Sequence, residues 1–243
     1  MGLTSTAAIG NEGLFRERVT APLPQLAWFA AGVTGAFLVP FVFTSLLDLQ
    51  HDLYYLVYFG FALAFLYSYA RWNSLDVGEL FRRNLLWSLG LGGLAAAFVV
   101  TNVLSRDSTP HPSGPYFGFE ILWRGAAYGA VDALLLSVFP CLVAYAFVGG
   151  HLNGALRKCG YGLLALFLVA VITGVYHLGY EQFRDDGIAG PEIGNTVITV
   201  PMLLTLNPAG SILAHSSMHV AAEVHSHETD LFLPPQQGDD HAE

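Results

Sequence analysis

The chain contains 243 residues, of which 53% are hydrophobic and only 12% are charged. This composition, together with recurring apolar runs of about 20 residues, excludes a soluble domain of this length and predicts an integral membrane protein surrounded by lipid. The net charge of −9 excludes the basic surface that nucleic-acid binding requires, so no nucleic-acid partner is expected.

Residues 1–25 are predicted to form a polar leader that carries Arg16 and Arg18. No removable signal peptide is expected, because no short apolar region is followed by a cleavage site. The first membrane span is predicted at Leu26–Leu47 and the second at Tyr54–Tyr69.

A polar connector, Asn73–Asn84, follows the second span, and its residues 80–83 predict a short helix that lies along the lipid headgroups. The third span is predicted at Leu85–Leu104. Small residues let membrane helices approach one another closely, and this span contains three glycines that favour such a contact. They are Gly90, Gly92 and Gly93.

The next loop, Ser105–Phe117, contains three prolines and cannot continue a helix. The segment that follows it, Gly118–Val148, is nearly all apolar. As one helix it would be about 46 Å long, well beyond the ~30 Å thickness of a hydrocarbon core. Pro140 is therefore expected to kink it, and a break into two elements at Ser137–Cys141 is the alternative.

Three further helices are predicted after residue 150. A span is predicted at Tyr161–Phe183, and the loop Arg184–Glu192 separates it from a short span at Asn195–Leu206. The last helix is predicted at Ala209–Val224. The tail, residues 225–243, is acidic and has no apolar period, so disorder is expected there.

Several of these helices carry polar residues at helical spacing. His177 and Glu181 lie four residues apart near the end of the 161–183 span, which predicts that they share one helix face. The last helix carries His215, His219 and Glu223, also at intervals of four.

The predicted fold is an all-α, polytopic transmembrane helix bundle of about seven spans, with six to eight possible, in a membrane domain at residues 26–224. Seven spans put seven basic connector residues on one side and only Arg106 and Arg184 on the other. The positive-inside rule then places the amino terminus in the cytoplasm and the carboxyl tail outside. The seven are Arg16, Arg18, Arg71, Arg82, Arg83, Arg157 and Lys158.

One stretch of this apolar chain contains an acid and a base, Glu120 and Arg124, four residues apart. On a helix these side chains lie about one turn apart, and each is costly in hydrocarbon unless it is paired. The pair is either part of a site or a bridge that fixes how helices dock. The seven-span topology places Glu120 at about the same depth as His177, His215 and His219, which favours a site. For Asp132, farther along the helix, a structural hydrogen-bonding role is expected.

These residues resemble three short motifs of the CAAX-protease and bacteriocin-processing family, also called the Abi family. In that family the motifs are Glu-Glu-x-x-x-Arg, Phe-x-x-x-His, and His-x-x-x-Asn or His-x-x-x-Asp. The resemblance covers residues 118–222. It matches Glu120 with the second glutamate, Arg124 with the arginine, His177 with the second-motif histidine and His215 with the third, while His219 stands in place of Asn or Asp.

The resemblance implies a membrane-embedded peptidase of the prokaryotic plasma membrane that acts on a peptide or membrane-protein substrate. In this interpretation Glu120 and His177 activate water, Arg124 holds Glu120 in place, and His215 with His219 polarises the scissile carbonyl. Three features depart from the family. Phe119 replaces the first glutamate, so the protein could be an inactive member of the family. Thr173 replaces the phenylalanine of the second motif. The separation of 57 positions between Glu120 and His177 is also longer than the family leads us to expect.

Two other functions fit the same residues. His177, His215, His219 and Glu120 could bind a divalent metal such as zinc, and two histidines on facing spans could bind haem. The remaining possibility is a protein that neither catalyses a reaction nor binds a cofactor. It would be a membrane scaffold or an immunity-type protein whose polar residues only hold helices together.

Overall fold

A computed structural model describes residues 13–15 and 22–227, and these residues form helices and no strands. The first half of the chain contains α1 (Pro22–Pro40), η1 (Phe41–Leu46), α2 (His51–Trp72), α3 (Val77–Arg82) and α4 (Leu85–Leu104). One long helix follows, composed of α5 (Pro115–Glu120), η2 (Ile121–Ala127), α6 (Tyr128–Ala133), η3 (Leu134–Val138) and α7 (Phe139–Phe147). The chain continues with α8 (Ala155–Leu178), α9 (Gln182–Asp186), α10 (Ala189–Thr205) and α11 (Ala209–His225).

Five helices are long and apolar enough to cross a membrane. They are Pro22–Leu46, His51–Trp72, Leu85–Leu104, Pro115–Phe147 and Ala155–Leu178. The prediction of an all-helical fold is thereby confirmed, and these five helices are candidate membrane spans. The predicted number of seven spans is not, because α10 and α11 each contain 17 residues and are shorter than these five.

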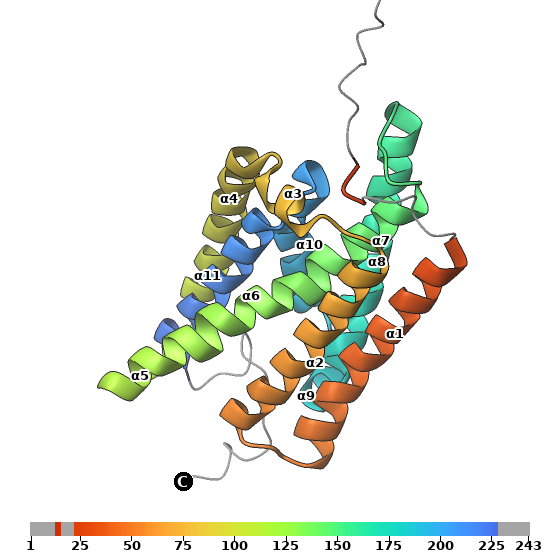
Figure 1. The fold of residues 1–243 in the computed structure, drawn as a ribbon. Helices are drawn as coiled ribbons and strands as arrows, with labels where there is room; N and C mark the ends of the chain where they lie inside the picture. Colours follow the sequence, from red (N-terminus) through yellow and green to blue (C-terminus); the bar gives the residue numbers. More distant parts are fainter. Residues whose placement is uncertain (1–12, 16–21, 228–243) are drawn as a thin grey trace, which may run out of the picture.

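Consecutive long helices run in opposite directions through the bundle (Figure 1). The loop that follows α4 meets the end of α11, where the Thr109 N–H donates to the His225 carbonyl at 3.0 Å. His225 Nε2 is likewise 3.0 Å from the Arg106 carbonyl oxygen. This loop and the start of the carboxyl tail therefore lie at one end of the bundle. Most of the predicted leader and tail, residues 1–12, 16–21 and 228–243, lies outside the described residues.

The long helix from Pro115 to Phe147 is continuous, so the alternative break at Ser137–Cys141 is wrong. Proline has no N–H, and its ring clashes with the carbonyl four residues earlier, which breaks a regular α-helix. Here the π-helical segment η3 directly precedes α7, which contains Pro140 near its start. The wider π turn moves the preceding carbonyls away from the proline ring. The π-helical segment η1 instead directly follows Pro40, the last residue of α1.

The predicted helix at Tyr161–Phe183 is wrong at its end. Helix α8 ends at Leu178, and a turn separates it from the short α9. Gly179 forms this turn against α1, where an added Cβ would lie 2.8 Å from the Phe37 carbonyl oxygen. Glu181 is therefore not on the helix that carries His177, and their expected pairing on one helix face does not form. The predicted loop 184–192 is also shorter than expected, because α10 begins at Ala189.

Helix α11 packs tightly against both α4 and the η2–α6 part of the long helix, and small residues make this possible. Gly92 of α4 lies against the backbone of Gly210 of α11, so that the space for a Cβ is already filled. An added Cβ at Gly129 would lie 2.6 Å from the Ser216 Cα. The expected close contact of α4 is thus made at Gly92, whereas Gly90 and Gly93 face open space.

Candidate functional site

Two antiparallel helix faces bring together the acidic and histidine side chains that are buried among the described residues, namely Glu120, Asp132, His215, His219 and Glu223. On the long helix, Glu120, Arg124, Tyr128 and Asp132 follow one another at intervals of four residues. On α11 two histidines and a carboxylate recur at the same interval, at positions 215, 219 and 223, and His227 follows at the next interval, two residues beyond the end of the helix. The antiparallel arrangement places Asp132 beside His215 and Glu120 beside Glu223, so each end of the helix pair has its own cluster.

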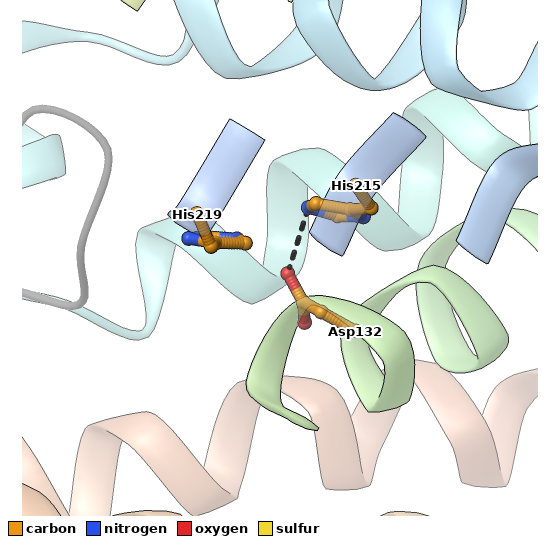
Figure 2. A group of neighbouring side chains, drawn as sticks. All are labelled: Asp132, His215 and His219. Carbon is orange, nitrogen blue, oxygen red and sulfur yellow. Dashed lines mark ion pairs between the residues drawn. The ribbon is translucent and has the colours of Figure 1, made fainter. Parts of the chain in front are cut away.

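The first cluster contains Asp132, His215 and His219, each of which is only 3–4% exposed. His215 Nε2 lies 3.3 Å from Asp132 Oδ2, as Figure 2 shows. One donor atom from each of the three residues lies within 4.8 Å of the other two. A carboxylate and two imidazoles at this spacing form a set of ligands that first-row divalent metals prefer.

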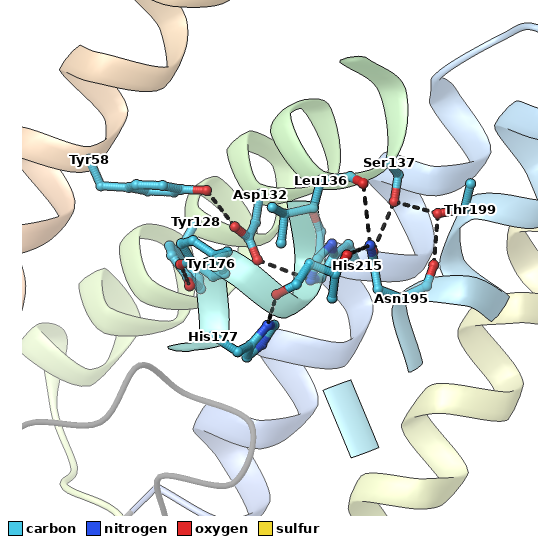
Figure 3. Close-up of polar contacts among 12 residues, drawn as sticks. Tyr58, Tyr128, Asp132, Leu136, Ser137, Tyr176, His177, Asn195, Thr199 and His215 are labelled. Carbon is cyan, nitrogen blue, oxygen red and sulfur yellow. Dashed lines mark hydrogen bonds and ion pairs between the residues drawn. The ribbon is translucent and has the colours of Figure 1, made fainter. Parts of the chain in front are cut away.

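Neighbouring aromatic residues fix the orientation of these three side chains. The Tyr58 hydroxyl donates to Asp132 Oδ1 at 2.5 Å, which leaves Oδ2 directed at His215 (Figure 3). The His215 and His219 rings stack with centroids 5.0 Å apart, and the Tyr128 ring packs edge-on against His219. A hydrogen-bonded carboxylate and two packed rings form a preorganised set of ligands, which metal sites require.

The cluster lies on the wall of a cavity of about 300 Å³. Its other walls come from α4, α8 and α10, and are largely apolar, with Val99 and Ile198 as examples. Asn102 near the end of α4 and Arg106 in the loop that follows it also line the cavity. Ligand pockets are typically apolar with a few placed polar groups, and this volume lies at the small end of their usual range of about 300–1,000 Å³.

His177 of α8 lines the same cavity, so the structure brings together His177, His215 and His219 as the sequence predicted. Its Nδ1 lies 2.8 Å from the Thr173 carbonyl oxygen, and the Tyr176 and Phe183 rings pack edge-on against it. A histidine whose Nδ1–H donates to a backbone carbonyl keeps its Nε2 lone pair available as a base or ligand.

Thr173 belongs to a polar network beside the cavity, whose members Ser137, Asn195 and Thr199 are labelled in Figure 3. Asn195 of α10 donates to the Thr173 hydroxyl at 2.6 Å and accepts from Ser137 at 2.9 Å. Thr199 in turn donates to Ser137 at 2.9 Å. These buried hydrogen bonds tie the long helix, α8 and α10 together and thereby fix the helix that carries His177.

Buried tyrosines next to the cluster were not singled out in the sequence. The hydroxyls of Tyr54, Tyr180, Tyr176 and Tyr128 form a continuous chain with O–O distances of 2.5–2.7 Å. Three of the cavity residues, Tyr128, Tyr176 and Tyr180, belong to it. The sequence signal that could have identified them is the four-residue spacing of Tyr54 and Tyr58, and of Tyr176 and Tyr180.

Asp132 was also assigned only a structural role, although it is the carboxylate that meets the histidines.

Glu120 and Arg124 do form the predicted ion pair, with Arg124 Nη1 3.0 Å from Glu120 Oε1. Neither residue lines the cavity that contains His177, His215 and His219. Twelve residues separate Glu120 from Asp132, which is about 18 Å along a helix, so Glu120 cannot share a ligand with the Asp132 cluster. The predicted combination of Glu120 with the three histidines is therefore not formed.

Arg124 has a second partner that the sequence did not reveal. Its Nε lies 3.0 Å from Asp52 Oδ1 at the start of α2, and Tyr116 also donates to Asp52 at 2.8 Å. Phe119 points away from this group, since it is 45% exposed and stacks with Tyr116 and Trp123. The position of the family's first glutamate thus lies outside both polar clusters.

No protein-family model, no curated protein and no solved structure matches this chain.

Proposed function

We propose that this protein is a membrane-embedded, metal-dependent hydrolase whose centre is formed by Asp132, His215 and His219. The observation that supports the proposal is the meeting of these three residues on the wall of an interior cavity. Catalytic zinc sites use three protein ligands and leave one position open to water or substrate. His215 and His219 lie four residues apart on one helix face, which is the histidine spacing found in helical zinc-binding motifs.

The separation of Asp132 from His215 is compatible with a tetrahedral metal. Two ligands that are each about 2.0–2.1 Å from one metal ion in tetrahedral geometry lie about 3.3–3.4 Å apart. The separation of His215 Nε2 from Asp132 Oδ2 is 3.3 Å. Tyr58 binds the other carboxylate oxygen and so supplies the supporting hydrogen bond that metal-binding carboxylates usually have.

The chain's own residues provide the rest of the chemistry. A divalent metal at this centre would lower the pKa of bound water and polarise a carbonyl. His177, with Nδ1 held by Thr173, is positioned to accept a proton through Nε2 from water in the cavity. The apolar walls limit bulk water and suit the apolar segment of a peptide or membrane-protein substrate. Hydrolysis of such a substrate agrees with the resemblance to the CAAX-protease family, with Asp132 in place of Glu120 as the essential carboxylate.

The proposed topology follows from the same bundle. We infer that α10 and α11 also cross the membrane, because each has 17 residues, the lower limit of about 17–25 for a span, and each packs among the five longer helices. The amino terminus is then cytoplasmic, and the protein resides in a prokaryotic plasma membrane. The loop 105–114 and the end of α11 face the outer side.

The test combines metal content with hydrolysis. Purified protein in detergent would be stripped with a chelator, reloaded with Zn²⁺ and assayed by mass spectrometry for bound metal. Its activity would be measured on a panel of fluorogenic peptides in liposomes. We expect His215→Ala to lose one metal equivalent and all hydrolysis, and His225→Ala, on the same helix but outside the cavity, to lose neither.

The outcomes separate the alternatives. Zinc bound at His215 without hydrolysis of any peptide would reduce the proposal to a metal-binding membrane protein. Equal metal content in the wild type and His215→Ala would exclude the centre itself. A Soret band in the purified protein, lost in His177→Ala, would instead support haem ligation.

A further inference from the structure

A second group of polar residues lies at the opposite end of the same helix pair. Glu120 of α5, Glu223 of α11 and His227, two residues beyond the end of α11, each have a donor atom within 4.8 Å of the other two. None of the three lines the cavity. We propose that these residues form a second divalent-cation site, independent of the Asp132 centre.

Buried carboxylate oxygens without hydrogen bonds are the first argument for an ion. Glu120 is 3% exposed and Glu223 is fully buried. Glu120 uses Oε1 for Arg124, whereas its Oε2 has no hydrogen-bond partner among the described residues, and neither has Glu223 Oε2. Buried polar atoms are nearly always satisfied, so two such oxygens in one cluster indicate a ligand that protein side chains do not provide.

The balance of charge is the second argument. Three carboxylates, those of Asp52, Glu120 and Glu223, lie around a single guanidinium, that of Arg124. Arg124 is within 3.0 Å of both Asp52 and Glu120, so its one positive charge serves two acids. The partner of Glu223 is His227, whose Nδ1 is 3.1 Å from Glu223 Oε1 and which is charged only when protonated. A divalent cation would remove the remaining excess of buried negative charge.

The types of ligand narrow the identity of the ion. Two carboxylates and one imidazole suit zinc or manganese, whereas calcium and magnesium sites are built from oxygen ligands alone. His227 is half-buried and follows the last turn of α11, so an ion can enter from this end of the bundle. A bound ion would fasten the end of α11 to α5, beside the pairing of Arg124 with Asp52.

Metal stoichiometry tests this second site. The full chain in detergent would be stripped with a chelator, incubated with Zn²⁺ or Mn²⁺, desalted and analysed for metal per chain. We expect two zinc equivalents in the wild type, one in His227→Ala, one in His215→Ala and none in the double variant. His225→Ala is the matched control, because His225 faces the Arg106 carbonyl instead of the cluster, and it should keep both equivalents.

Glu223→Gln serves as a second variant that keeps the side-chain volume and removes a ligand charge. In His215→Ala, zinc should raise the Tm, and His227→Ala or Glu223→Gln in that background should remove this shift. Loss of an equivalent in His227→Ala but not in His215→Ala would support this site while excluding the Asp132 centre. Unchanged zinc content in both His227→Ala and Glu223→Gln, or loss in His225→Ala instead, would overturn the proposal.

Discussion

Asp132 of α6 and His215 of α11 are in contact across two antiparallel helices, with Oδ2 3.3 Å from Nε2. Both side chains are buried, and Asp132 uses one carboxylate oxygen for His215 and the other for the Tyr58 hydroxyl. The contact therefore couples the docking of α11 to the ligand set of the cavity. A double-mutant cycle measures that coupling.

We expect Asp132→Asn and His215→Gln each to lower the stability, and the two changes together to cost less than their sum. Residues in one polar network usually show coupling energies of about 0.5–3 kcal/mol. Unfolding of metal-free protein in detergent would give the three values, so that loss of metal does not contribute. Strictly additive losses would mean that the two groups do not interact in solution.

The Arg124 guanidinium joins three helical segments, and its removal should be costly. Arg124→Met leaves Asp52 and Glu120 without their shared cation, and breaking buried ion pairs costs about 3–5 kcal/mol. Glu120→Gln should cost less, because Arg124 keeps Asp52. Thermal unfolding would rank the variants. Arg82→Met is the control, since Arg82 pairs with Glu79 at an exposed site and its loss should change the Tm little.

Contact between α4 and α11 depends on the absence of a side chain at Gly92. Gly92→Ala places a methyl group against the Gly210 backbone and should lower the Tm and reduce metal binding together, since α11 carries His215. Gly90→Ala has open space and replaces the poorest non-proline helix former, so it should be neutral or stabilising by up to about 1 kcal/mol. Equal effects of the two substitutions would contradict the close packing.

Phe119→Glu should not create or increase hydrolytic activity. The side chain at this position is exposed and points away from the cavity, so a new carboxylate there could not reach the histidines. Its expected effect is a modest loss of stability through the lost stacking with Trp123. The peptide assay in liposomes would compare it with Asp132→Asn, which should be inactive. A gain of activity in Phe119→Glu would restore Glu120 and its neighbour as the catalytic acids.

Topology can be checked with single cysteines in a background that lacks Cys141 and Cys159. An impermeant thiol reagent applied to intact cells should label Ser113→Cys, in the loop after α4, and should not label Ala155→Cys, at the start of α8. Lysed cells should label both, which controls for reactivity. Labelling of Ala155→Cys alone would invert the proposed orientation.

Sequence patterns predicted several helices well for physical reasons that are local. The bounds of α4 agree with the predicted span Leu85–Leu104, because an apolar run there lies between polar connectors. The last helix also begins at Ala209 as predicted, directly after Asn207-Pro208. The end of α8 was missed because it depends on Gly179 packing against α1, a contact between segments far apart in sequence.

The site was only partly predictable for the same kind of reason. Helical spacing identified the histidines and the pairing of Glu120 with Arg124, since both follow from single helices. Which carboxylate meets His215 depends on where α11 crosses the long helix. Contacts such as that of Gly129 with Ser216 set this crossing, and the hydrophobic periodicity of a single helix does not predict such contacts between helices. Asp132 was thus known as a buried acid but not as the partner of the histidines.

The π-helical segment η2, Ile121–Ala127, sets the angular phase between the two clusters. In a regular α-helix each step of four residues turns about 40° past a full circle, so three steps from Glu120 to Asp132 would accumulate about 120°. A wider turn takes up part of that rotation, and both acids can then face α11. Deleting Ala126 would leave Glu120 and Asp132 eleven residues apart, and eleven steps of a regular α-helix end only about 20° past three full turns, so both acids would still face α11. The π-helical segment therefore accommodates one extra residue between the two clusters without turning either acid away from α11.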